Sequence, residues 1–284
     1  MKPREPTPLT VVIAARGGPE PATRALASLD GQQAAILVVY PKTEAYLAPP
    51  GVRAEPVGTD TFSGLRAEGL NLAQTPAVAI FSQDYTADSD WAVIASQPAE
   101  AEVVCGEVYP PDSGWTARAA YLWEYAHLAP PCRSGMLSAE ESRLVPAGAV
   151  VYRGAAIDAR RLQENASELD YHAQMAADGL RFYREPRLRL KYHPPGSLSQ
   201  FRADRRRWSR DDARDRNGDR SIFQRLALAA TRTALPPVLL IRFCRALSLK
   251  PCYWLSAMVS SPLLVLFAID QMVGEIRGLL TDDS

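Results

Sequence analysis

The chain lacks the features that mark several classes of protein. Of its 284 residues, 47% are apolar and 23% are charged, and 32 basic side chains face 32 acidic ones. A net charge of zero disfavours general affinity for nucleic acid, and the apolar fraction disfavours disorder because it suffices to bury a core. The composition also excludes collagen, a coiled coil and a disulfide miniprotein. The length predicts one large domain, alone or with an appendage.

Cysteine and lysine are both scarce. The four cysteines show no CxxC or Cys/His spacing, so neither a zinc site nor a disulfide framework is predicted, and a reducing compartment is favoured. Only four of the basic residues are lysines, and the others are arginines. The first ten residues contain three prolines and no apolar run, so we expect no secretory signal.

No nucleotide-binding glycine motif is present either, but strands and helices alternate. The absence of G-x-G-x-x-G and of a P-loop pattern removes the main support for dinucleotide redox or P-loop chemistry. Leu9–Ala15 and Ala35–Tyr40 are apolar runs typical of buried parallel strands, and Glu20–Leu29 between them has helical spacing. Together they predict a βαβ unit.

The alternation continues for more than a hundred residues. Helices are predicted over Phe62–Gln74, Trp115–His127 and Glu168–Gly179, and strands over Ala77–Phe81, Glu102–Val108, Val145–Arg153 and Leu180–Tyr192. The sequence therefore predicts an α/β fold with a mostly parallel central sheet. We expect this domain to cover residues 1–210, followed by a charged hinge over 211–220 and an apolar helical tail over 221–284.

Four segments stand out in order along the chain: VVIAARGGPEPATRALASL, GLRAEGLNLAQTPAVAIFSQDYTADSDW, SELDYHAQMAADGLRFYREP and KYHPPGSLSQFRADRRRWSR. Taken together, they resemble the family-2 glycosyltransferases, enzymes of the nucleotide-sugar fold called GT-A. They are similar, in turn, to the family's first strand and helix, its Arg-Asn-x-Gly helix with the D-x-D turn, its Glu-Asp acceptor helix, and its His and Arg-Trp stretch. The resemblance covers roughly residues 9–210.

The resemblance implies a divalent cation, Mg²⁺ or Mn²⁺, held by Asp84 and His193. Asp84 follows a predicted strand, and ligands of open α/β sheets bind beyond the carboxyl ends of strands. A carboxylate is also the hard oxygen ligand that such cations prefer. Two alternatives stay open: Asp84 caps the following turn, and His193 is an ordinary loop histidine. Two of the carboxylates usual in the family's D-x-D turn are missing here, since the turn reads Ser82-Gln83-Asp84.

The same resemblance implies the donor-binding residues. Relatives carry an arginine where Arg66 stands and an Arg-rich segment over the diphosphate, and a guanidinium fork suits phosphate oxygens. The acid that often follows the second strand is replaced by Tyr40-Pro41, so the nucleobase is not predicted. The predicted donor-binding residues are Arg16, Arg66, Asp84, Arg205, Arg207 and Trp208.

Glu168 falls where the family has its catalytic carboxylate, and Asp170 lies two residues further on. A sugar hydroxyl needs a base to accept its proton, and a carboxylate at the head of a helix can point into a cleft. Both acids would also favour the dipole of a helix start without any catalytic role. We expect Glu168 and Asp170 to be the catalytic pair, with Glu168 as the base.

The composition of the C-terminal tail predicts association with a membrane. Between Lys250 and Asp270, 19 residues carry no formal charge, which is about the length of a bilayer span. Leu235–Leu249 is interrupted by prolines and arginines and suits an interfacial helix better. A span, a surface-lying hairpin and a buried core helix remain open for the tail. The end, FAIDQMVGEIRGLL, resembles the tail of membrane-associated members of the family.

Two functions follow as hypotheses. One is an inverting, metal-dependent glycosyltransferase that moves a sugar from a nucleotide donor to an envelope-glycan or lipid-linked acceptor. We expect it at the cytoplasmic face of the cell membrane, in contact with membrane lipid and without nucleic acid. The other is a membrane-attached binding or scaffold protein that keeps the fold without turnover, which the thinned D-x-D motivates.

Overall fold

The computed structural model describes residues 7–17, 20–112, 114–127, 129–145, 148–158, 160, 162, 168–194, 196–217, 220–248 and 250–281. The chain divides into two compact units. Residues 1–109 and 130–192 form the first, which we call the α/β unit. Residues 110–129 and 193–284 form the second, which we call the helical unit. Each is described by itself below.

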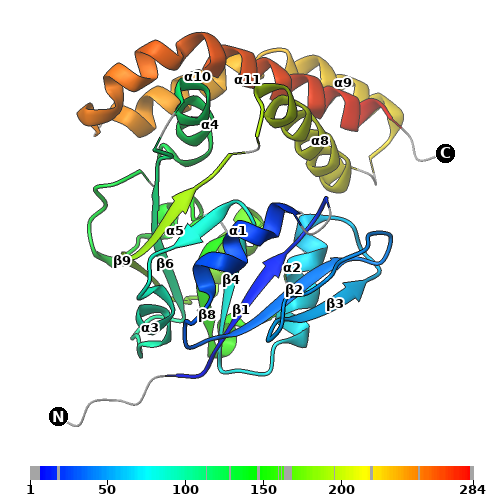
Figure 1. Ribbon diagram of the computed structural model, residues 1–284. Coiled ribbons are helices and arrows are strands. Elements are labelled where there is room, and N and C mark those ends of the chain that lie inside the picture. The colour runs from blue at the N-terminus through cyan, green and yellow to red at the C-terminus, as the bar shows by residue number, and fades with distance from the viewer. Residues whose placement is uncertain are drawn as a thin grey trace. The chain divides into compact units, whose positions relative to one another are not determined.

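A nine-stranded sheet forms the centre of the α/β unit (Figure 1). The strand order is β3-β2-β1-β4-β8-β6-β9-β5, and β7 pairs with β9. The strands are β1 (Leu9–Ala14), β2 (Ala35–Pro41), β3 (Arg53–Val57), β4 (Ala77–Ser82), β5 (Tyr85–Ala87), β6 (Val103–Tyr109), β7 (Gly135–Met136), β8 (Ala149–Arg153) and β9 (Phe182–Tyr192).

Most of these strands run in one direction. β1 is parallel to β2 and β4, β2 is parallel to β3, and β6 is parallel to β9. β8 lies antiparallel between β4 and β6, so β6 and β9 run the same way as β1. Only β5, β7 and β8 oppose them among the described strands. The predicted α/β fold with a mostly parallel sheet is confirmed.

Apolar runs explain which strands the sequence predicted. All six residues of β1 are buried, and so are five of the six in β4, as expected for central parallel strands. β3 was not predicted because it is an edge strand with a single buried residue, Val57, and with Pro56 inside it. An edge position tolerates proline and needs no continuous apolar run.

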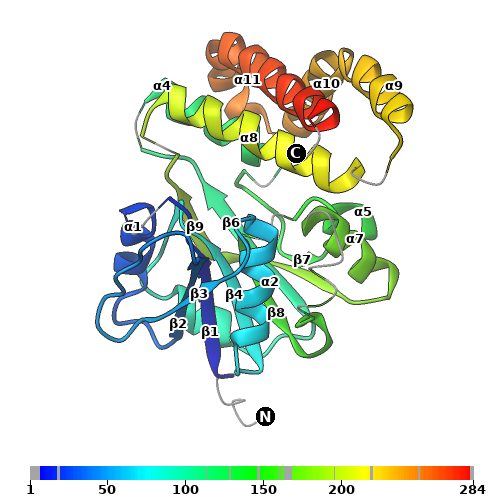
Figure 2. The same cartoon turned by 90° about the vertical axis from the view of Figure 1, so that its right-hand side faces the viewer.

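Helices of the α/β unit flank this sheet, with α1 and α2 on opposite faces (Figure 2). Thr61 caps α2 by accepting a hydrogen bond from the Gly64 N–H at 3.1 Å. A Cβ atom at Gly69 would lie 2.2 Å from Val12 Cγ1, so this glycine lets α2 approach β1. The helices are α1 (Glu20–Leu29), α2 (Phe62–Leu72), α3 (Trp91–Ser96), α5 (Ala139–Ser142) and α7 (Glu168–Ala177), with a 3₁₀ turn at Gly154–Ala156.

The helical unit contains no strand among its described residues. Its long helix α11 packs on α4, α8, α9 and α10. The tail therefore adds no strand to the sheet, which is what the sequence predicts. The helices are α4 (Trp115–Tyr125), α8 (Leu198–Asn217), α9 (Ile222–Arg232), α10 (Leu235–Ser248) and α11 (Trp254–Leu280), with a 3₁₀ turn at Pro251–Tyr253.

Two features join α8 to α11. The carboxylate of Asp270 is 1% exposed and accepts hydrogen bonds of 2.6 Å from Arg202 Nε and Arg206 Nε. Four and eight residues further on, α11 has glycines where α8 passes: a Cβ at Gly274 would lie 2.4 Å from the Arg206 carbonyl oxygen, and one at Gly278 would lie 2.2 Å from that of Arg210. Small residues four apart allow two helix backbones to approach closely.

The boundaries of the units differ from the predicted ones. The predicted hinge over 211–220 is helical as far as Asn217, within α8. The structural boundary follows Tyr192 rather than residue 210, and α4, predicted within the first domain, belongs to the helical unit. The physical reason is packing: the Arg-rich segment and α4 bury their inner faces against α11, a contact between segments far apart in the sequence.

Candidate functional site

Polar side chains gather where the first four parallel strands end. Because β1, β2, β3 and β4 run the same way, the segments that follow them share one edge of the sheet. Arg16 follows β1, Glu44 follows β2, Asp60 follows β3 and Gln83 follows β4. This is the edge at which open α/β sheets bind their ligands.

Arg16 is held in place by two neighbouring strand ends. Its backbone N–H donates to Gln83 Oε1 at 3.0 Å, and Gln83 Nε2 donates back to its carbonyl oxygen at 3.4 Å. Its Nη2 atom lies 3.4 Å from Asp60 Oδ2. The Arg16 side chain is 13% exposed and that of Asp60 is 69% exposed, so the guanidinium is fixed while its partner faces solvent.

A second arginine approaches the same place. The guanidinium carbons of Arg16 and Arg66 lie 5.9 Å and 5.6 Å from the centre of the Phe62 ring. Both distances fall within the range of cation–π attraction. Phe62 and Arg66 are one turn apart on α2, so the helix and the β1 loop together bring two predicted donor-binding residues to one aromatic ring. Two guanidinium groups so placed suit phosphate oxygens.

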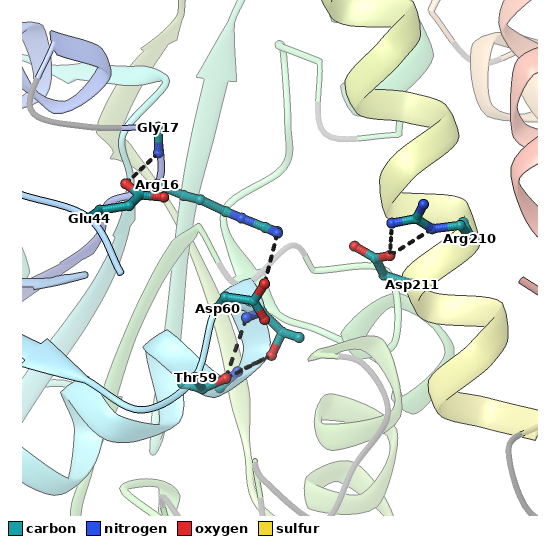
Figure 3. A network of polar contacts seen from close by, with 9 residues as sticks. Arg16, Gly17, Glu44, Thr59, Asp60, Arg210 and Asp211 are labelled. Atoms are coloured by element: carbon teal, nitrogen blue, oxygen red, sulfur yellow. Dashed lines mark hydrogen bonds and ion pairs between the residues drawn. The ribbon is translucent and has the colours of Figure 1, made fainter. Parts of the chain in front are cut away.

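Three polar residues of this edge were missed by the sequence analysis. Glu44 accepts a hydrogen bond of 2.8 Å from the Gly17 N–H, and Asp60 pairs with Arg16 (Figure 3). Gln83 holds the Arg16 backbone, as described above. The sequence signal for these residues is their position, since each lies within three residues of a strand's end. Glu44 and Asp60 belong to no recognisable motif and do not directly follow an apolar run, so position alone did not single them out.

Asp84 lies in the turn between β4 and β5, half-buried. Its backbone N–H donates to Ser82 Oγ at 3.3 Å. The adjacent Gln83 carries an amide, which is bonded to the Arg16 backbone. Asp84 therefore supplies the carboxylate of this turn. The structure thus brings Arg16, Arg66 and Asp84, three of the predicted site residues, to one edge of the sheet.

Asp84 offers one carboxylate at this edge, an oxygen ligand of the kind that divalent cations prefer. Mg²⁺ is commonly bound by one or two carboxylates together with substrate phosphates. No group of three His, Cys, Asp or Glu side chains that could hold a metal occurs in the described part of the chain. Tyr85, next to Asp84, is the register partner of Tyr192, and His193 follows Tyr192 as the first residue of the helical unit.

The predicted catalytic acids lie at the start of α7. Glu168 is the first residue of this helix, and its side chain lies outside the described residues. Asp170 is exposed. The next two residues fix the helix: Tyr171 donates a hydrogen bond of 2.8 Å to the Ala156 carbonyl oxygen, and buried His172 has ring nitrogens 2.7 Å from Tyr152 Oη and from the Val145 carbonyl oxygen.

The predicted Arg-Trp segment lies on α8, where Arg205 has a partner inside the helical unit. Arg205 forms an ion pair with Glu124 of α4, and both side chains are mostly buried. Its guanidinium carbon lies 5.8 Å from the Phe201 ring and 5.6 Å from the Trp208 ring. Burial lowers the pKa of Arg205 to about 10. Arg207 is exposed and Trp208 is half-buried.

Comparisons with known proteins give two similar solved structures. They are crystal structures of S. aureus TarS 1-349, alone and in complex with UDP-GlcNAc. The identities are 13% and 12%, each covers 95% of this chain and 89% of the TarS chain, and the TM-scores are 0.46 and 0.47. No protein-family model and no curated protein matches the chain.

Proposed function

We propose that this chain is a glycosyltransferase that moves a sugar from a nucleotide-sugar donor, with inversion at the anomeric carbon and with the help of a divalent cation. The observation that carries the proposal is the placement of Arg16 and Arg66 around Phe62, at the strand-end edge that also carries Asp84. The order of sequence segments that resemble family-2 glycosyltransferases supports it.

The two arginines would bind the diphosphate of the donor. A nucleoside diphosphate leaves a sugar carbon with its negative charge on phosphate oxygens, and fixed cations stabilise that charge as it develops. Arg16 needs little reorganisation for this role, because Gln83 and Asp60 already hold its backbone and side chain. Glu44 and Asp60 would offer carboxylates to the sugar hydroxyls of the nucleoside.

A bound Mg²⁺ or Mn²⁺ would neutralise further charge on the leaving diphosphate. Asp84 would hold it together with the donor's own phosphate oxygens, and His193 is proposed as the second protein ligand. Trp208 and Arg207 of α8 are proposed to contact the donor or the acceptor. Arg205, which is paired with Glu124, is better suited to holding α8 against α4 than to binding phosphate.

Glu168 is proposed as the general base, with Asp170 as its neighbour and second candidate. The acceptor hydroxyl oxygen forms a bond to the anomeric carbon on the side opposite the diphosphate. The bond from that carbon to the diphosphate oxygen breaks, and its electron pair leaves with the nucleoside diphosphate. The hydroxyl proton passes to the Glu168 carboxylate. Displacement from the opposite side inverts the anomeric configuration.

The acceptor is proposed to be a glycan or a lipid-linked sugar of the cell envelope, used at the cytoplasmic face of the membrane. The apolar helices of the helical unit support this placement, since α9, α10 and α11 all carry exposed apolar side chains. One of them, over Pro251–Leu280, is long and apolar enough for a span by length and composition alone. A lipid-linked acceptor would then be presented to an enzyme that is already at the membrane.

Calorimetric titration with UDP or GDP, with and without Mn²⁺, tests the donor site. Asp84→Asn should weaken Mn²⁺-dependent binding by about tenfold or more, because it removes the carboxylate of the turn. Asp30→Asn, an exposed acid at the end of α1, is the matched control. Equal affinities of the Asp84→Asn variant and the parent would contradict the assignment of Asp84.

Turnover is measured as release of nucleoside diphosphate from a panel of nucleotide sugars. Glu168→Gln should keep donor binding and lower transfer on the order of 100-fold or more, because the amide cannot accept the proton. Asp170→Asn serves as the comparison, and full activity in Glu168→Gln would move the base to Asp170. Donor binding without turnover in the parent protein would favour the binding or scaffold function instead.

A further inference from the structure

Apolar side chains are exposed along three neighbouring helices of the helical unit. Figures 1 and 2 show α9, α10 and α11 side by side. On α11, Leu255 and Met258 are 74% and 72% exposed, and on α9 Phe223 is 79% exposed. The apolar face, as we call this set, consists of Ile222, Phe223, Leu226, Val238, Ile241, Trp254, Leu255, Met258, Val259, Val265 and Ile269, all of them exposed.

The spacing of these residues shows that the face is continuous along α11. Leu255 is followed three and four residues later by Met258 and Val259, Val265 lies seven residues after Met258, and Ile269 lies four after Val265. These spacings place all five on one side of the helix. Buried residues alternate with them, including Leu263, Phe267 and Ala268. α11 is therefore two-sided, with one side packed inside the unit and the other exposed. A helix surrounded by lipid would be apolar on every side.

The buried side of α11 is attached to the helical unit along its length. Just before its first residue, the Tyr253 ring lies tilted against Tyr121 of α4, with ring centres 6.4 Å apart. In the middle, the Phe267 ring lies 6.2 Å from Trp123 and 4.7 Å from Phe201. These contacts hold α11 beside α4 and α8.

The far end of α11 is attached to α8 through charged and glycine contacts. Asp270 is buried between two arginines, and Gly278 lies against the α8 backbone. α8 carries more than half of its 20 residues as arginine or aspartate. If α11 crossed a bilayer, it would either draw this charged helix into lipid or leave Asp270 there without its partners. Both are costly, since a charge at the bilayer centre is disfavoured by about 3 kcal/mol or more.

The charged residues within the segment that carries the apolar face have one sign. Residues 220–269 contain no aspartate or glutamate, and they contain six basic residues. Arg242 and Arg245 are both exposed on α10, within one turn of the exposed Val238 and Ile241. Their guanidinium groups form no ion pair within the part of the chain that the structure describes. An apolar face with exposed arginines beside it, on a segment that carries no acid, is complementary to a leaflet with anionic headgroups.

We propose that the apolar face docks the helical unit onto an anionic membrane surface, with α11 lying in the plane of one leaflet rather than crossing the bilayer. Arg242 and Arg245 lie at the level of the headgroups, and the exposed side chains of α9, α10 and α11 enter the acyl region. Trp254, half exposed at the start of α11, takes the interfacial position that tryptophan favours. The proposal concerns lipid binding alone and does not depend on the proposed transferase activity.

The first test is sedimentation of the full chain with vesicles. Vesicles of phosphatidylcholine alone and with 30% phosphatidylglycerol are compared at low and high salt. Binding should be stronger with phosphatidylglycerol and should weaken as salt rises, because the attraction between arginines and headgroups is screened. Equal binding to both vesicle types, or none, would overturn the assignment of an anionic leaflet.

Two pairs of variants separate the apolar and the charged contributions. Leu255→Glu with Met258→Glu should lower binding on the order of tenfold or more, because two exposed apolar side chains no longer enter the lipid. Arg242→Gln with Arg245→Gln should lower it by roughly fivefold for each charge, and only on anionic vesicles. The controls are Leu47→Glu and Arg24→Gln with Arg133→Gln, all exposed positions of the α/β unit.

All altered side chains are exposed, so the variants should fold, which circular dichroism and melting temperature verify. If the face instead binds a second copy of the chain, Leu255→Glu with Met258→Glu will convert a dimer to a monomer in ultracentrifugation. The parent protein will then not sediment with vesicles of either composition. That result would overturn lipid docking.

Labelling at the far end of α11 distinguishes lying from crossing. Thr281→Cys is introduced together with Cys132→Ser, Cys244→Ser and Cys252→Ser, which leaves only the buried Cys105 besides the new thiol. The protein is added to the outside of preformed vesicles, and a membrane-impermeant maleimide follows. Labelling before detergent supports a helix in one leaflet. Labelling only after detergent would show that α11 crosses, and would overturn this orientation.

Discussion

The two units of this protein use charged residues in opposite ways. In the α/β unit, the core cluster is apolar, built from residues such as Val12, Ile80 and Tyr152, and the charges of the candidate site stand at the strand ends. In the helical unit, charges lie between the helices, as in Asp270 with its two arginines and in Arg205 with Glu124. A cluster of arginines in a sequence therefore indicates a ligand site only when those arginines are not already ion-paired between packed helices.

The largest expected effect is the loss of the buried carboxylate in the helical unit. Asp270→Ala leaves Arg202 and Arg206 facing each other without their shared partner. It should lower the free energy of unfolding of that unit by about 2–3 kcal/mol, because charge-assisted hydrogen bonds are lost while the two arginines, 31% and 39% exposed, still reach solvent. Denaturant titration measures it. Asp211→Ala, which breaks a surface pair with the adjacent Arg210, is the control and should cost under about 1 kcal/mol.

A rescue sharpens this test. Replacing Asp270 with leucine and both arginines with methionine removes all the charges together and should recover most of the loss, because buried charge pairs are often replaceable by apolar groups of similar volume. If Asp270→Ala behaved like Asp211→Ala, the carboxylate would not hold α8 and α11 together.

A smaller effect is expected at the closest approach of α8 and α11. Gly278→Ala gains about 1 kcal/mol of helix propensity, but its Cβ would lie 2.2 Å from a backbone carbonyl oxygen. Overpacking costs about 1–3 kcal/mol, and a helix backbone cannot move aside as a side chain can, so we expect a net loss of up to about 2 kcal/mol. Gly58→Ala, with open space around its Cβ, should change the melting temperature little. A more stable Gly278→Ala variant would contradict the close approach.

The third prediction contrasts an arginine of the site with an arginine of the packing. Arg16→Gln should weaken binding of a nucleoside diphosphate by about tenfold, or about 1.4 kcal/mol. We expect little loss of stability, because Asp60, which is 69% exposed, is solvated by water when its partner is removed. Arg205→Gln should instead lower the stability of the helical unit, since Glu124 would remain buried without its partner. Calorimetry and thermal melts on both variants decide between the two roles. A large loss of stability in Arg16→Gln would mean that Arg16, like Arg205, serves packing rather than ligand binding.

The smallest effect is a pH dependence in the α/β unit. Glu102 joins the start of β6 to Arg181 before β9, and the hydrogen bond from Arg181 lowers the pKa of this carboxyl from 4.5 to about 2. A folded-state pKa below the unfolded one gives stability that is complete above about pH 4.5 and is lost as the pH falls toward 2. The gain is small because Arg181 is mostly exposed and water screens its attraction to Glu102.

Glu102→Gln measures this contribution. The difference in unfolding free energy between the parent and the variant should be larger at pH 7 than at pH 2.5. A difference that grows on acidification would have the opposite sign to the one that the lowered pKa requires.

Sequence patterns predicted the α/β unit well because its strands are buried on both faces. β1, β2 and β4 stand within one residue of their predicted bounds, and α1 matches its predicted range. Elements with mixed exposure were missed, as the edge strand β3 and the short β5 show. Of the site, Arg16, Arg66 and Asp84 were nominated from the sequence, whereas Glu44, Asp60 and Gln83 gain their places only from the neighbouring strand ends.

By itself, the sequence determined the order of strands and helices, the apolar character of the C-terminal helices and the absence of acids from residues 220–269, because each depends on residues close together in the chain. Only the tertiary structure decided that α8 and α4 join those helices, that Asp270 neutralises two arginines, and that α11 has a packed side and an exposed one. The physical reason is that an ion pair or a close helix contact depends on which distant segments meet. Arg202 and Asp270 are 68 residues apart, and that spacing in the sequence does not predict their contact.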